Sequence, residues 1–89
     1  MIKETVPIIN KLGLHARAAA KLVSTATRYA SDIKITRNGK EVDGKSIMSV
    51  MMLAASCGTD IDITVEGPDE NEAINALKEL ISDRFGEGE

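Results

Sequence analysis

Alternation of hydrophobic and polar residues predicts strands in three stretches of the chain. These stretches are residues 2–8, 32–43 and 61–66. Pro7 has no N–H group to donate to a neighbouring strand, so we expect the first strand at a sheet edge. The middle stretch contains Asn38-Gly39, a strong local signal for a two-residue turn, and therefore supplies two strands joined as a hairpin.

Apolar residues three or four positions apart predict helices between these strands. The first helix runs from about Ala16 to Tyr29, and its apolar face comprises Ala19, Leu22, Val23, Ala26 and Ala30. Its opposite face is a basic stripe made of Arg17, Lys21, Ser24 and Arg28. The last helix follows Asp69, an expected N-cap with Glu72 placed for a capping-box-like contact. Its buried face is expected to contain Ala73, Ile74, Leu77, Leu80 and Ile81.

A short apolar helix is predicted over residues 47–55, ending near Gly58. Val50, Leu53, Ala54 and Cys57 already form an inward stripe that is sufficient to pack this helix against the sheet. That leaves four apolar side chains without an obvious core to enter, namely Ile47, Met48, Met51 and Met52. They are either buried, as in most wholly apolar helices, or an exposed patch for a protein partner. Methionine suits the second use because its flexible side chain adapts to more than one partner.

The resulting element order is β-α-β-β-α-β-α. It predicts an α+β open-faced sandwich, in which three helices cover one face of a four-stranded antiparallel sheet. The length of 89 residues fits a single domain, residues 1–89. We expect its last four residues, 86–89, to form a frayed tail.

Charge is distributed unevenly along the chain. Residues 1–50 carry nine Lys and Arg against four Asp and Glu, whereas residues 51–89 carry two against ten. The basic half favours an acidic partner or an anionic ligand. An acidic chain with few aromatic residues argues against nucleic acid. The single Cys57, the lack of a long apolar run and the polar start of the chain predict a cytoplasmic protein without membrane insertion.

The single histidine, His15, lies in Gly13-Leu14-His15-Ala16-Arg17, where a loop turns into a helix. Unpaired N–H groups and the positive end of the helix dipole at such a place favour a phosphate, and Arg17 adds a cation. His15 is therefore either a phosphoryl acceptor or a surface residue that begins the helix. One histidine and one distant cysteine do not form a metal site, and we expect no cofactor.

Ser46 precedes the short apolar helix and is a good N-cap. An added phosphate would also be tolerated electrostatically at this position. The residues alone favour the cap.

Two motifs together, residues 13–17 and the run Gly44-Lys45-Ser46-Ile47-Met48-Ser49-Val50-Met51, resemble the HPr family. Its members are histidine-containing phosphocarriers of the bacterial phosphoenolpyruvate-dependent sugar phosphotransferase system. The resemblance covers nearly the whole chain, including the element order and the hairpin. Two positions depart from the family pattern: Ala18 stands where proline is usual, and Ser49 where glycine is frequent.

The resemblance implies that His15 takes a phosphoryl group on Nδ1 from phosphorylated enzyme I and donates it to enzyme IIA domains. It implies that Arg17 neutralises phosphoryl charge and that Ser46 is a regulatory site for an ATP-dependent HPr kinase/phosphorylase in those bacteria that have one. The implied partner-binding residues are Ala16, Ala20, Ser24, Ile47, Met48 and Met51. Such a protein is a carrier rather than an enzyme, and we expect a monomer.

Two other functions stay open on the sequence. A nitrogen-type phosphocarrier would use the same histidine chemistry for regulation instead of transport. A regulatory binding module would act through phosphorylation of Ser46, although the presence of His15 argues against this as the sole role.

Overall fold

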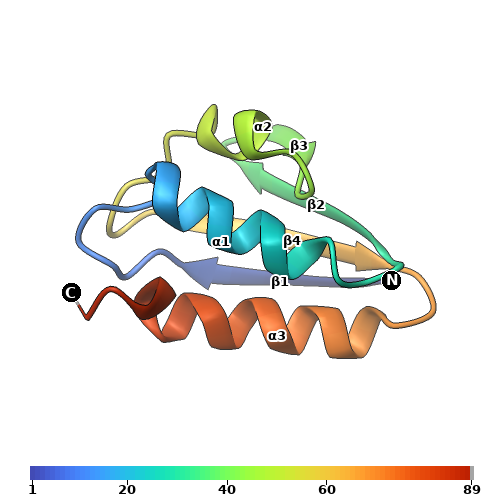
Figure 1. Ribbon diagram of the computed structural model, residues 1–89. Coiled ribbons are helices and arrows are strands. Elements are labelled where there is room, and N and C mark those ends of the chain that lie inside the picture. The colour runs from blue at the N-terminus through green and yellow to red at the C-terminus, as the bar shows by residue number, and fades with distance from the viewer. Residues whose placement is uncertain (89) are drawn as a thin grey trace.

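Four antiparallel strands form one sheet in the order β1-β4-β2-β3 in the computed structural model, which describes residues 1–88 (Figure 1). The strands are β1 (Ile2–Pro7), β2 (Asp32–Arg37), β3 (Lys40–Asp43) and β4 (Asp60–Glu66). Pro7 on β1 pairs with Asp60 on β4, and β1 lies at an edge of the sheet as predicted. The predicted hairpin is also confirmed, since Arg37 pairs with Lys40 across the two-residue turn. Both turn residues have positive φ, 51° at Asn38 and 80° at Gly39.

Three helices lie on one face of the sheet, which confirms the predicted α+β sandwich (Figure 1). They are α1 (Ala16–Ala26), α2 (Ile47–Met51) and α3 (Glu70–Ser82), followed by the 3₁₀ turn η1 (Arg84–Gly86). The core between sheet and helices is built from aliphatic side chains, among them Leu22, Ile33, Ile35, Ile61, Ile63, Val65 and Leu77. The other face of the sheet is polar, where Thr5 donates to Asp62 at 2.6 Å. No helix within residues 1–88 is long and apolar enough to cross a membrane.

Helix α1 is shorter than the sequence predicts. It ends at Ala26, and the N–H groups of Arg28 and Tyr29 bond three residues back in turns, at 3.2 Å each. The chain leaves the helix here because other elements hold its backbone: Lys45 Nζ donates to the Tyr29 carbonyl at 2.8 Å. The expected burial of Ala30 is wrong, since this residue is exposed.

Helix α2 is also shorter than predicted and has a different inward stripe. Ala54 adopts a left-handed conformation with φ 50°, which ends the helical path and turns Ala55 inward. The buried residues of this segment are therefore Val50, Leu53 and Ala55, whereas the predicted Ala54 and Cys57 are exposed.

The start of α3 is fixed by tertiary contacts rather than by a capping box. Asp69 stands at the N-cap position as predicted, but its carboxylate accepts from the N–H groups of Ala30 at 2.9 Å and Ser31 at 3.0 Å, and from the Ser31 hydroxyl. These bonds, the hydroxyl bond above all, hold the pKa of Asp69 below its ordinary value. The side chain that reaches back is Glu70, not Glu72, and it accepts from the Gly67 N–H at 3.3 Å.

The chain end departs from the expected frayed tail at Gly86 and Glu87. Phe85 is fully buried, Gly86 belongs to η1, and Glu87 contacts the loop before α1. Of the tail predicted over residues 86–89, Glu89 lies outside the described residues. The C-terminal turn thus packs beside the start of α1 (Figure 1).

Candidate functional site

His15 is the N-cap residue of α1 and is presented by a loop that packs on the segment after α2. The Leu14 N–H donates to the Ala55 carbonyl at 2.9 Å, which fixes the loop next to the histidine. Gly13 has φ 67°, and a Cβ built on it would lie 2.5 Å from the Ala55 oxygen. Only glycine fits both the conformation and the space, so this course of the loop before His15 requires glycine at position 13.

A buried asparagine organises the inside of this loop. Asn10 is fully buried, and its Nδ2 donates to the Gly13 carbonyl at 2.8 Å and to Glu87 Oε1 at 3.0 Å. Because both partners are acceptors, the amide must direct its NH₂ group toward them. Asn10 therefore connects the loop before α1 to the turn at the end of the chain.

Glu87 also touches the histidine itself. Its Oε2 forms a hydrogen bond with His15 Nε2, while its Oε1 accepts from the Asn10 amide. The Asn10 hydrogen bond, reinforced by His15, lowers the pKa of Glu87 below its ordinary value. Nδ1, the second ring nitrogen of His15, has no hydrogen-bond partner among residues 1–88.

An open hollow of about 620 Å³ surrounds the imidazole. It is lined by Lys11, Leu12, His15, Ala16, Arg17, Lys21, Gly86 and Glu87. The hollow thus combines three cationic side chains with the start of α1, where the His15 side chain makes no capping bond. Lys21 is partly engaged, since its Nζ donates to the Phe85 carbonyl at 2.6 Å. A dianionic group bound in this hollow would be stabilised by such surroundings.

The structure brings Arg17 next to His15 but leaves Ser46 on a different helix. Ser46 is the N-cap of α2, and its hydroxyl accepts from the Ser49 N–H at 3.4 Å, so the predicted cap is confirmed. Ala18, which replaces the usual proline, is fully buried in the first turn of α1.

The apolar side chains of α2 are exposed rather than buried, so the buried interpretation of the sequence is wrong, and a role in partner binding stays a prediction. Exposed fractions are 43% for Ile47, 73% for Met48, 38% for Met51 and 63% for Met52. Helix α2 packs against α1, whose Ala16 and Ser24 are exposed and whose Ala20 is half-buried. The six residues implied to bind partners therefore lie on two neighbouring helices and are all at least partly accessible.

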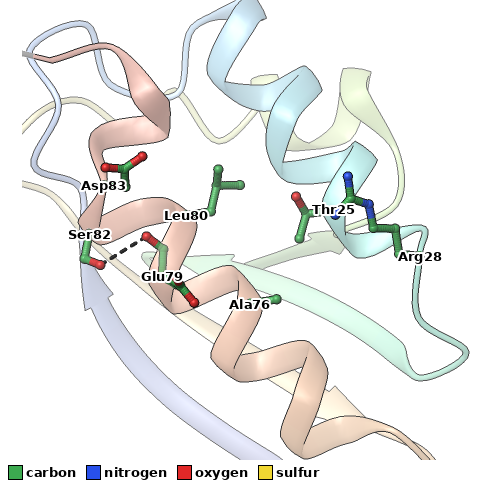
Figure 2. A pocket seen from close by; sticks show the side chains of 7 residues that line it. All are labelled: Thr25, Arg28, Ala76, Glu79, Leu80, Ser82 and Asp83. Atoms are coloured by element: carbon green, nitrogen blue, oxygen red, sulfur yellow. Dashed lines mark hydrogen bonds between the residues drawn. The ribbon is translucent and has the colours of Figure 1, made fainter.

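A second hollow, of about 660 Å³, lies between α1 and α3 (Figure 2). Arg28 and Thr25 come from α1 and the turn after it, while Glu79, Leu80 and Asp83 lie on the opposite side. None of the residues singled out as a candidate phosphoryl, regulatory or docking site lines it. The hollow at His15 is thus the better candidate because it combines a nucleophile with cations.

Sequence reasoning missed Asn10 and Glu87 as parts of the site. These two residues are 77 positions apart, and Glu87 lies 72 positions after His15. No local sequence motif indicates a contact between residues so far apart in the sequence. The polar end Gly86-Glu87-Gly88-Glu89 even favoured a frayed tail.

Together the fold and the site define a small α+β module that presents one histidine at a helix start among cations. The family model of the phosphotransferase-system HPr component phosphorylation site matches residues 2–83. Phosphocarrier protein HPr from Cupriavidus necator is 56% identical over 89 residues, covering 100% of both chains. That from Pseudomonas aeruginosa is 60% identical over 85 residues, covering 94% of each. The chain therefore belongs to the HPr family, the phosphocarriers of the phosphotransferase system.

Solved structures agree with this membership. A crystal structure of HPr from Thermoanaerobacter tengcongensis superimposes with a TM-score of 0.95 at 47% identity, covering 98% of each chain. A crystal structure of an HPr dimer from the same organism matches with a TM-score of 0.79, covering 98% of this chain and 100% of that one. The monomeric state expected from the sequence stays a prediction.

Proposed function

We propose that this protein carries a phosphoryl group on Nδ1 of His15. It accepts the group from phosphorylated enzyme I and passes it to enzyme IIA domains in phosphoenolpyruvate-dependent sugar transport. The observation that carries the proposal is a helix-start histidine whose Nδ1 has no hydrogen-bond partner within residues 1–88 and which lines a hollow that Lys11, Arg17 and Lys21 make cationic.

The transfer needs only positioning and charge neutralisation on this side. The Nδ1 lone pair forms a bond to phosphorus while the bond from phosphorus to the donor breaks, and that electron pair stays with enzyme I. The reverse exchange delivers the phosphoryl group to enzyme IIA. Arg17 and the N–H groups at the start of α1 offset the negative charge of the phosphoryl oxygens in both directions. The partners supply the remaining groups, so the protein acts as a carrier.

The docking surface of this proposal combines α1 and α2. It comprises Ala16, Ala20, Ser24, Ile47, Met48 and Met51. Exposed methionine on α2 supports the assignment, because such side chains adapt to two different partners. A carrier must release each partner after transfer, which fits a small apolar patch on a monomer acting in the cytoplasm.

Ser46 is the proposed regulatory site, modified by an ATP-dependent HPr kinase/phosphorylase. It is half-buried at the start of α2, where its hydroxyl already faces the Ser49 N–H. A phosphate at an N-cap is compatible with the helix.

Incubation with phosphoenolpyruvate and enzyme I tests the proposed function. We expect one phosphoryl group per chain, labile in acid and stable in base, located on His15 by mass spectrometry. His15→Ala should fold, as shown by its thermal melt, and should take up none. A His15→Ala protein that still acquires the same label would disprove the assignment.

A further inference from the structure

We propose that Glu87 is a positioning residue for phosphoryl transfer, holding the proton of His15 on Nε2 so that Nδ1 is presented as the nucleophile. The inference rests on the proposed function and adds a residue to its mechanism. It comes from the contact between Glu87 Oε2 and His15 Nε2.

One hydrogen bond holds the Glu87 carboxylate from the side of the loop before α1, and two more hold the turn that carries Glu87. Asn10, buried in the loop before α1, donates to its Oε1 at 3.0 Å. The Glu87 N–H donates to the Arg84 carbonyl at 2.9 Å, within the turn that buries Phe85. Lys21 ties the same turn to α1 through the Phe85 carbonyl at 2.6 Å. The side chain that meets the imidazole is therefore oriented before any phosphoryl donor arrives.

A carboxylate at Nε2 decides which ring nitrogen is nucleophilic. Neutral imidazole carries one proton, on either nitrogen, and the other nitrogen keeps the lone pair. An ionised carboxylate only accepts hydrogen bonds, so its partner nitrogen must be the protonated one. The lowered pKa of Glu87, caused first by the Asn10 bond, keeps this carboxyl ionised at neutral pH. Nδ1 is then left with its lone pair directed away from Glu87.

The same contact suits both halves of the carrier cycle. When Nδ1 forms its bond to phosphorus, the proton stays on Nε2 and the ring becomes cationic, which Glu87 stabilises as an ion pair. When the phosphoryl group leaves, the bonding electron pair returns to Nδ1 and the ring departs as neutral imidazole. No proton has to enter or leave the site in either direction.

Substitution of Glu87 by glutamine separates this role from mere packing. The glutamine amide has nearly the same shape as the carboxylate but offers Nε2 either a donor or an acceptor, so the tautomer is no longer dictated. The matched control is Glu79→Gln, the same change at an exposed position of α3 away from the histidine. Imidazole ¹⁵N chemical shifts of folded protein at mildly basic pH report the tautomer. Time courses with enzyme I report the phosphorylation rate.

We expect Glu87→Gln to increase the share of His15 protonated on Nδ1, with Glu79→Gln like the wild type. Groups that orient an imidazole through its second nitrogen are worth on the order of 10–100-fold at metal sites, and we expect a rate loss of about tenfold here. Identical ¹⁵N shifts and rates in the two variants would overturn the inference. If the wild-type chain takes no phosphoryl group, the proposed function fails, while the ¹⁵N shifts still decide whether Glu87 sets the tautomer.

Discussion

At the scale of single residues, we expect the neutralisation of phosphoryl charge in the hollow to depend most on Arg17. It is exposed, follows His15 by two positions and lines the same hollow. Arg17→Ala should slow phosphoryl transfer by on the order of 10²-fold or more, because a preorganised cation at the reacting group is lost. The free energy of unfolding should change by less than ~0.5 kcal/mol, as at other exposed positions. Rapid-quench measurement of transfer from enzyme I, beside thermal melts, tests both expectations.

Arg28→Ala is the matched control for this prediction. Arg28 is exposed after the same helix but lines the hollow between α1 and α3 (Figure 2). Arg28→Ala should therefore lower the transfer rate far less than Arg17→Ala does. Equal rates for the two variants, at equal stability, would remove Arg17 from the transfer step.

The candidate residues that sequence alone could identify are those whose proposed role depends on local context. His15 and Arg17 are two positions apart, and Ser46 immediately precedes its helix, so spacing and capping rules apply directly. Asn10 and Glu87 escape such rules because their contact exists only after the first loop and the last turn have met in space. The reactive residues of the proposed site are thus close together in sequence, whereas the orientation of the imidazole depends on contacts between residues that are far apart in sequence.

At the scale of elements, the periodicity of the chain correctly predicts β1 to β4 and α1 to α3 but not η1, and tertiary contacts set where the helices end. α1 ends where the side chains of Asp69 and Lys45 form hydrogen bonds with backbone groups of residues 29–31, and neither partner is near in sequence. α2 ends because Ala54 turns to the left-handed region, which its hydrophobic pattern does not reveal.

The exposed and buried faces of helix α2 should respond differently to substitution. Met48 is 73% exposed, whereas Val50, two positions later, is fully buried. Met48→Ala should leave the free energy of unfolding within ~0.5 kcal/mol and weaken enzyme I binding. Val50→Ala should lower the free energy of unfolding by about 1–3 kcal/mol, because it removes buried methyl groups. Chemical denaturation and titration with enzyme I distinguish the two faces of the helix.

Unaltered affinity of Met48→Ala for enzyme I, with unaltered stability, would show that this part of α2 does not dock. A large loss of stability in Met48→Ala would contradict the exposure of its side chain. The partly exposed Met51 is expected to show a mixture of both effects, since 38% of it is accessible.

At the scale of the whole molecule, the fold gathers basic residues from the first half of the chain around His15. The basic loop and α1 surround His15, whereas acidic residues are concentrated on β4 and α3. The strand order β1-β4-β2-β3 places the acidic strand β4 at the centre of the sheet, with its carboxylates on the polar face. Periodicity predicts that the sheet has one covered face, but the order of its strands depends on pairings between distant segments.

The basic surroundings of His15 lead to an expectation for a negative group at Ser46. Asp is a good N-cap, so Ser46→Asp should preserve α2 and the fold. It should nevertheless slow phosphorylation of His15, because a basic surface favours an acidic docking face on enzyme I and the new charge repels that face. Ser46→Ala is the control: it loses the cap, at a cost of about 0.5–2 kcal/mol, but adds no charge. The rate deficit of Ser46→Asp should shrink as salt is raised, since exposed charges are screened. A Ser46→Asp protein that is phosphorylated as fast as Ser46→Ala at low salt would leave Ser46 as a helix cap only.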